Sequence, residues 1–183
     1  MSQAAPFLIR SRPIEMLDSY FLFGFQESGV GPFLMLAFDL RMLFFSHPLD
    51  PVCGNFSGSQ DVARDLNCLQ SNGVTHVINL VSNIVPNLYP HLFDYLSLVL
   101  YDDMHFPLGD SIRQCVNYLE RVRRAGGVCF VHCDVGRCRA PSMVIAYLIK
   151  IEDYSYERAY TEVNNARNVA INLNFKMQLM SLA

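Results

Sequence analysis

The chain has 183 residues, 51% of them hydrophobic, which is enough for one domain with a buried core. It carries 14 basic and 17 acidic side chains, and this mildly acidic balance argues against nucleic acid or an anionic membrane surface as a partner. Six scattered cysteines indicate a reducing compartment rather than a disulfide-stabilised secreted domain, so we expect a cytoplasmic protein that is also found in the nucleus.

Residues 1–55 show no regular alternation of helix and strand signals, and we treat them as an N-terminal extension. The stretch from Val30 to Phe45 is apolar, but Pro32, Asp39 and Arg41 interrupt it. A membrane span needs about 20 mostly apolar residues, and charges at its centre are costly. We therefore expect a packed or poorly ordered extension, with membrane association as the alternative.

After residue 56, the hydrophobic pattern alternates between the period of helices and that of buried strands. Helices are predicted over 59–72, from Asp110 or Ser111 to the glycines at 126–127, over 141–149, from Ser155 to 167, and after Asn174. Strands are predicted over 74–80, over 95–101 and in the run that ends at His132. This alternation predicts an α/β sandwich with a central, mostly parallel sheet and helices on both faces.

The most informative segment joins the last strand to the helix that begins near Pro141. It reads His132, Cys133, Asp134, Val135, Gly136, Arg137, Cys138, Arg139. A strand, a tight loop and a helix N-terminus in this order make an anion-binding cradle, because backbone N–H groups converge there and the helix dipole favours negative charge. We expect Cys133 at its base to be a thiolate nucleophile. The planar guanidinium of Arg139 can hold two phosphate oxygens at once.

The cysteines of this region could also have structural or metal-binding roles. A cysteine in an apolar strand is usually a small buried hydrophobe, and we interpret Cys129 in this way. His132, Cys133 and Cys138 could contribute to a zinc site, but no second cysteine or histidine pair completes a tetrahedron. We therefore expect no metal.

The loop fits the pattern H-C-x-x-G-x-x-R and resembles that of the cysteine-dependent protein phosphatases. Segments 58–63, 73–79 and 167–179 are similar to the small, atypical dual-specificity phosphatases, and the likeness covers residues 56–183. It implies a protein-tyrosine-phosphatase-like three-layer sandwich. It also implies hydrolysis of phosphotyrosine and phosphoserine/threonine through a cysteinyl-phosphate, without cofactors. Phosphorylated proteins are the implied partners, with signalling kinases among them by family analogy.

A phosphate ester needs a general acid to protonate its leaving oxygen. The family takes an aspartate from a loop after a strand, about thirty residues before the cysteine. Asp102 stands 31 positions before Cys133, so the resemblance favours it, with Asp103 as the alternative acid. His105 lies in the same loop, where a histidine is more often simply solvated.

The residue after the arginine departs from the family pattern. Relatives carry Ser or Thr there, whose hydroxyl helps the sulfur leave in the second step, whereas this chain has Ala140. We expect slower hydrolysis of the intermediate. Ser142, two positions on, could substitute for the hydroxyl or could simply support the start of the helix.

Two further departures lie inside the loop. Asp134 would repel a phosphate dianion if it faced the ligand, and we expect it to point outward. Cys138 stands where Ser or Gly is common, and it could either fill space or form a reversible disulfide with Cys133.

These departures leave two alternatives to an active protein phosphatase. One is a weakly active or inactive phospho-binding regulator. The other is a phosphatase of a non-protein substrate, such as RNA ends, lipids or sugars.

Overall fold

The computed structural model describes residues 58–166 and 168–182. Its central sheet has three strands, β1 (His76–Asn79), β2 (Asp94–Ser97) and β3 (Cys129–His132), in the order β2-β1-β3. Both pairings are parallel, with Ile78 opposite Leu96 on one side and Val131 on the other. The carboxyl ends of β1 and β3 therefore meet at one edge, where ligands of such sheets bind.

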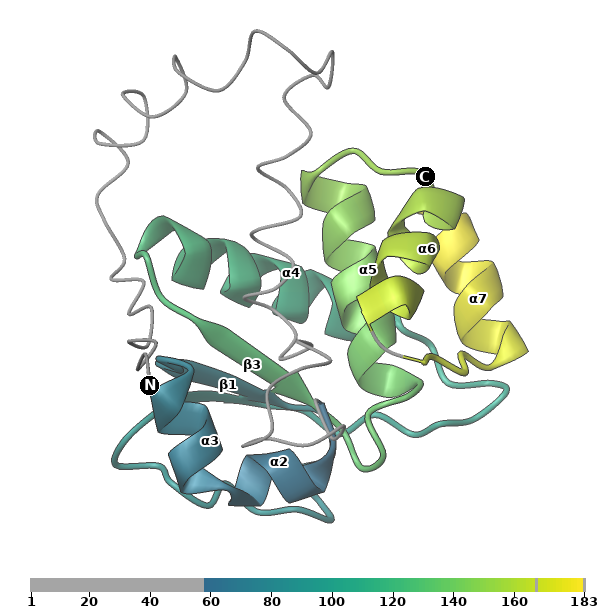
Figure 1. The fold of residues 1–183 in the computed structure, drawn as a ribbon. Coiled ribbons are helices and arrows are strands. Elements are labelled where there is room, and N and C mark those ends of the chain that lie inside the picture. Colours follow the sequence, from purple (N-terminus) through teal and green to yellow (C-terminus); the bar gives the residue numbers. More distant parts are fainter. Residues whose placement is uncertain (1–57, 167, 183) are drawn as a thin grey trace, which may run out of the picture.

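Six helices surround the sheet in the described part of the chain: α2 (Gln60–Arg64), α3 (Leu66–Ser71), α4 (Gly109–Arg124), α5 (Arg139–Ile151), α6 (Tyr156–Ala166) and α7 (Leu173–Met180). Figure 1 shows α2 and α3 on one side of the sheet and the four longer helices on the other. The arrangement is the predicted α/β sandwich.

The alternation of side chains along the strands explains why both faces are covered. Val77 and Phe130 point into a small cluster with residues of α2 and α3. Ile78 and Val131 point the other way, into the main core with residues of α4 to α7. All four side chains are at most 1% exposed. Because successive strand residues face opposite sides, one strand supplies both hydrophobic layers.

The predicted helix over 59–72 is wrong, because the structure divides it into α2 and α3. Asp65 interrupts it with an extended backbone (φ −87°, ψ 90°), and its carboxylate accepts from the Cys68 N–H at 2.9 Å. A short acidic side chain that satisfies a free N–H favours the start of a new helix over continuation of the old one.

Other element boundaries also differ from the predictions. The last helix was expected to begin after Asn174, but it begins at Leu173. Its N-cap is Asn172, whose Oδ1 accepts from the Phe175 N–H. Helix α4 begins at Gly109 without a side-chain cap. The strand predicted over 95–101 ends at Ser97, and Val99 forms an isolated antiparallel bridge with Val81. Ser155 accepts from the Arg158 N–H at the start of α6, in agreement with its predicted role.

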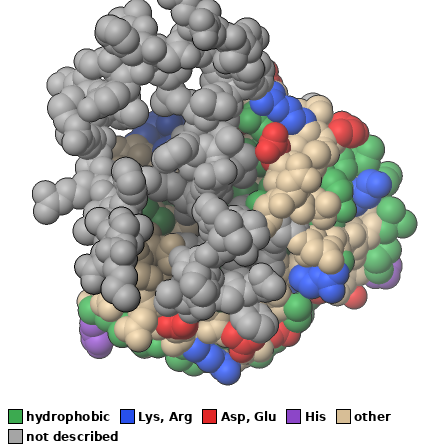
Figure 2. All heavy atoms as spheres, in the orientation of Figure 1, with side chains coloured by type: hydrophobic (Ala, Val, Ile, Leu, Met, Phe, Trp, Pro, Cys, Tyr) green, Lys and Arg blue, Asp and Glu red, His purple; other side chains and the backbone are tan. Residues whose placement is uncertain are grey.

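The N-terminal extension and its apolar stretch from Val30 to Phe45 lie outside the described residues. Among the helices that are described, none has the length and apolar character needed to cross a membrane. On the face drawn in Figure 2, acidic and basic side chains of the described residues are interspersed and do not gather by sign.

Candidate active site

The candidate nucleophile lies directly after β3, at the carboxyl edge of the sheet. Cys133 is 1% exposed, and its N–H donates to the Gly58 carbonyl at 3.2 Å. The Gly136 N–H donates to Cys133 Sγ at 3.2 Å. Gly136 has φ +76°, a left-handed conformation that disfavours other residues. The loop thus turns a backbone N–H inward onto the sulfur.

Arg139 opens α5 and closes the loop. Its Nη1 donates to the Leu100 carbonyl at 3.3 Å, which ties the guanidinium to the segment after β2. Its Nε is buried and finds no hydrogen-bond partner among the described residues. A buried guanidinium N–H without a partner is costly, so this atom offers a donor to a bound anion.

The structure distinguishes the two candidate acids by their contacts. Asp102 Oδ1 accepts from the Cys138 thiol at 3.2 Å and from Asn172 Nδ2 at 2.7 Å. Asp103 Oδ1 instead accepts from the His105 N–H at 2.8 Å and lies 3.6 Å from that imidazole. The geometry therefore brings Asp102, and not Asp103, into contact with the loop of residues 133–139, which is called the phosphate loop below.

The loop that carries Asp102 and Asp103, residues 101–107, is called the acid loop below, and it lines an open depression of about 530 Å³. Its walls include the rings of Tyr101 and Phe106, whose centroids lie 5.8 Å apart. Asp102 belongs to the same lining, so the depression offers space for a group that approaches this carboxylate.

Three other residues of the loop lie on its outer side, away from the Cys133 sulfur. Asp134 turns toward α2, where its Oδ1 accepts from Gln60 Nε2 at 2.6 Å and its carbonyl accepts from the Gln60 N–H at 2.9 Å. Val135 is 62% exposed. Arg137 is exposed, and its carbonyl accepts from the Ala170 N–H at 2.8 Å.

His132 supports the loop from inside the sheet. It is 1% exposed and stacks on Phe130, with the ring centroids 5.6 Å apart. Its Nδ1 lies 3.3 Å from the Cys133 carbonyl oxygen. Burial lowers the pKa of His132 to about 4, so the imidazole is neutral near pH 7.

Two small side chains complete the start of α5. Ser142 is fully buried, and its hydroxyl donates to the Cys138 carbonyl at 2.8 Å. That proton is therefore committed to the helix backbone. Ala140 is also fully buried and contributes no polar group beside the loop.

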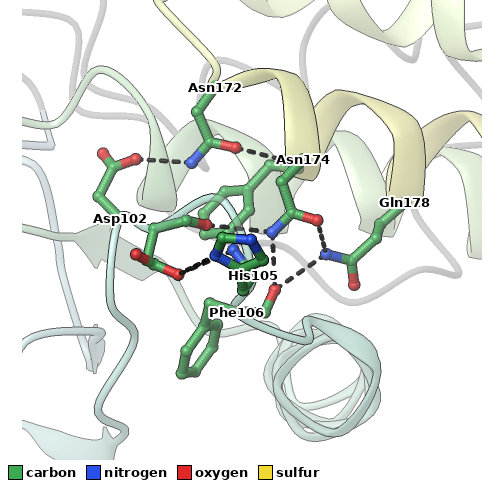
Figure 3. A network of polar contacts seen from close by, with 8 residues as sticks. Asp102, His105, Phe106, Asn172, Asn174 and Gln178 are labelled. Atoms are coloured by element: carbon green, nitrogen blue, oxygen red, sulfur yellow. Dashed lines mark hydrogen bonds and ion pairs between the residues drawn. The ribbon is translucent and has the colours of Figure 1, made fainter.

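Helix α7 and its N-cap residue contact the acid loop in a way that the sequence did not predict. Besides Asn172, Asn174 Nδ2 and Gln178 Nε2 both donate to the Phe106 carbonyl at 2.9 Å. Figure 3 shows these amides converging on the acid loop. One feature of the sequence could have indicated these contacts. Asn172 is a favourable N-cap residue, and it lies within the segment 167–179 that resembles the phosphatases.

The arrangement combines a buried thiol that accepts from the Gly136 N–H, a guanidinium with a free donor and a carboxylate at the edge of the loop. Such a set can hold an oxyanion, attack it and protonate a leaving group. No group of three or more potential metal ligands occurs within 58–166 and 168–182.

Comparison with known proteins agrees with this geometry. The family model described as "Dual specificity phosphatase, catalytic domain" matches residues 56–183. The chain is 35% identical over 142 residues to protein-tyrosine-phosphatase MKP1 of Arabidopsis thaliana, covering 76% of this chain and 18% of that protein. It spans between 12% and 65% of the length of four curated relatives that it matches.

Two solved structures extend the comparison. A mouse putative dual specificity phosphatase complexed with zinc tungstate has a TM-score of 0.64 and 28% identity, covering 68% of this chain and 78% of that one. The human tyrosine phosphatase-like serine/threonine/tyrosine-interacting protein has a TM-score of 0.59 and 25% identity, covering 68% of this chain and 83% of that one.

Proposed function

Because this chain belongs to the dual specificity phosphatase family, we propose that it hydrolyses phosphotyrosine and phosphoserine/threonine in proteins. Two observations on the same loop support this most directly: the buried Cys133 thiol accepts from the Gly136 N–H, and the buried Arg139 Nε has no hydrogen-bond partner among the described residues. A tetrahedral dianion would supply the acceptor that Arg139 Nε lacks. Tungstate, which accompanies the mouse relative, is an oxyanion of the same shape.

In the first proposed step, the Cys133 thiolate attacks phosphorus in line with the ester oxygen. The S–P bond forms as the P–O bond to the substrate breaks. Arg139 and the loop N–H groups hold the equatorial oxygens, whose charge grows in the transition state. Asp102 gives its proton to the leaving oxygen, so that the alcohol or phenol departs neutral.

In the second proposed step, water attacks the cysteinyl-phosphate. Asp102, now a carboxylate, takes a proton from the water as the new P–O bond forms. The S–P bond breaks, which releases phosphate and restores the Cys133 thiolate. The net reaction consumes one water and needs no other reactant.

Phosphorylated proteins are the proposed substrates, and signalling kinases are candidates by family analogy. Cytoplasm, with access to the nucleus, is the proposed location. Both proposals rest on the family to which the chain belongs.

The first experiment compares wild type with Cys133→Ser, Asp102→Asn and Asp103→Asn on para-nitrophenyl phosphate and on phosphotyrosine and phosphothreonine peptides. We expect Cys133→Ser to abolish turnover. Loss of the acid costs about 10²- to 10⁴-fold, and we expect it in Asp102→Asn alone. Turnover that survives in Cys133→Ser contradicts the proposed function, and a silent Asp102→Asn change contradicts only the choice of acid.

A second candidate function is a phospho-binding regulator with little turnover. Ala140 favours it, because a hydroxyl that assists the second step is missing from the start of α5. The solved human relative described as phosphatase-like and as an interacting protein is a precedent for such a role. Peptide binding that is equal in wild type and Cys133→Ser, without turnover in either, would favour this candidate.

A further inference from the structure

The carboxylate of Asp102 is held by two donors that lie far away in the sequence. The Cys138 thiol reaches Oδ1 from the phosphate loop at 3.2 Å, and the Asn172 amide reaches the same oxygen from the N-cap of α7 at 2.7 Å. The Asn172 N–H also donates to Cys138 Sγ at 3.4 Å. Asp102, Cys138 and Asn172 thus form a closed ring of hydrogen bonds, which we call the acid triad.

The direction of each bond in the acid triad is set by its surroundings. Asn172 Oδ1 accepts from the Phe175 N–H at 2.8 Å, so its Nδ2 is the end that faces Asp102. This orientation suits Oδ1 of Asp102, which accepts in both contacts. Burial, with a smaller contribution from Asp102, raises the pKa of Cys138 to about 12, so its thiol keeps the proton that it donates.

Helix α7, which follows Asn172, is packed firmly against the rest of the molecule. Helix α7 is anchored in the main core through Phe175 and Leu179, both fully buried. Gln178 accepts from the Leu108 N–H at 2.7 Å and donates to the Phe106 carbonyl, so α7 also holds the far end of the acid loop. Figure 3 shows the amides of α7 facing this loop, with Asn172 directed at Asp102.

Asp102 itself is exposed, and an exposed side chain is free to leave a productive conformation. A misplacement of about 1 Å can cost about 100-fold in rate. We propose that Asn172 and Cys138 are positioning residues that hold Asp102 against the phosphate loop, an inference that rests on the proposed phosphatase function.

The test uses a substitution that separates the two roles of Asn172. Ser is a good N-cap, so Asn172→Ser keeps the acceptor for Phe175 but removes the amide that reaches Asp102. Cys138→Ala removes the thiol donor, whereas Cys138→Ser retains a hydroxyl donor. Asn164→Ser is the matched control, since the Asn164 side chain accepts from the Val169 N–H and has no part in the acid triad.

The ratio of kcat on two substrates distinguishes loss of the acid from a general loss of stability, because a general loss lowers both values equally. Phenyl phosphate needs a proton on its leaving oxygen, whereas 2,4-dinitrophenolate departs readily without one. We expect Asn172→Ser and Cys138→Ala to lower kcat on phenyl phosphate by about 10- to 100-fold, with a much smaller effect on the dinitrophenyl ester. Cys138→Ser and Asn164→Ser should keep the wild-type ratio, and Asn172→Ser should cost nothing further in an Asp102→Asn background.

An equal fall on both substrates, or no fall, overturns the positioning role while leaving the proposed function intact. Failure of the function itself appears separately, as wild-type turnover that does not depend on Cys133. Crystal structures of wild type and Asn172→Ser add a readout that needs no turnover. We expect the Asp102 carboxylate to leave Cys138 in the variant, and an unmoved carboxylate overturns the proposal even for an inactive protein.

Discussion

At the scale of single residues, Asp134 shows how a charge can sit in an anion-binding loop without opposing the anion. Its carboxylate turns toward α2 and accepts from Gln60 at 2.6 Å. The side chain therefore fastens the loop to α2, and the repulsion expected from an inward carboxylate does not apply. The expectation that it points outward agrees with this contact.

Ala140 gives the prediction that belongs to this scale. Ser142 cannot supply the missing hydroxyl while its proton is donated to the Cys138 carbonyl. We expect Ala140→Ser to raise the rate of cysteinyl-phosphate hydrolysis by about tenfold or more, because a new donor can stabilise the departing sulfur. Burst-phase kinetics with mass spectrometry of the trapped intermediate would measure it.

A matched control for this change is Ala146→Ser, since Ala146 is also fully buried on α5 but lies away from the loop. It should leave turnover unchanged. Accumulation of phosphoenzyme that persists in Ala140→Ser would contradict the prediction.

At the scale of elements, Glu120 links the two longest helices. Its carboxylate accepts from Arg123 and Arg124 at 2.8 Å within α4 and from the Tyr147 hydroxyl of α5 at 3.3 Å. The bonds from Arg123, above all, and from Arg124 lower the pKa of Glu120 from 4.5 to about 2, against the opposing effect of burial. The packing of α4 on α5 therefore depends partly on an ionised group.

The sign of the pH dependence follows from the lowered pKa. A carboxyl whose pKa is lower in the folded state stabilises it above the unfolded value, near 4.5, and loses this effect as the pH falls toward 2. We expect Glu120→Gln to unfold at a lower urea concentration than wild type at pH 7, with a difference that shrinks between pH 4.5 and pH 2. Glu162→Gln on α6 is the control, and a difference that does not depend on pH would be the contrary result.

At the scale of the whole molecule, the phosphate loop is the point where the layers meet. It receives contacts from Gly58 and Gln60 near α2, from Leu100 after β2 and from Asn172 at α7. A ligand bound there should therefore stabilise the complete fold and not only the loop.

This coupling can be measured by thermal unfolding with tungstate. At about 100 times its dissociation constant a ligand adds about 2.7 kcal/mol to stability, which corresponds to a rise in Tm of about 5 to 15 °C. We expect that rise in wild type and its loss in Arg139→Ala. Arg113→Ala removes an exposed arginine of α4 and should behave as wild type; an equal rise in Arg139→Ala would show that the anion binds elsewhere.

The sequence by itself determined the alternation of helices and strands and the candidate nucleophile loop. Both signals are local: periodicity spans one element, and Cys133, Gly136 and Arg139 lie within seven consecutive positions. The break at Asp65 and the cap at Asn172 were missed because several polar residues near each boundary could serve as caps.

Only the tertiary structure decided which distant side chains meet. Asp102 and Asp103 are chemically identical neighbours, and their different contacts arise from side-chain directions that spacing does not encode. Asn172 lies 70 residues from Asp102 in the chain, and only the packing of Phe175 and Leu179 in the core brings the two together. Such contacts depend on how the helices pack on the sheet. This packing involves residues from several segments, so it cannot be predicted from one segment alone.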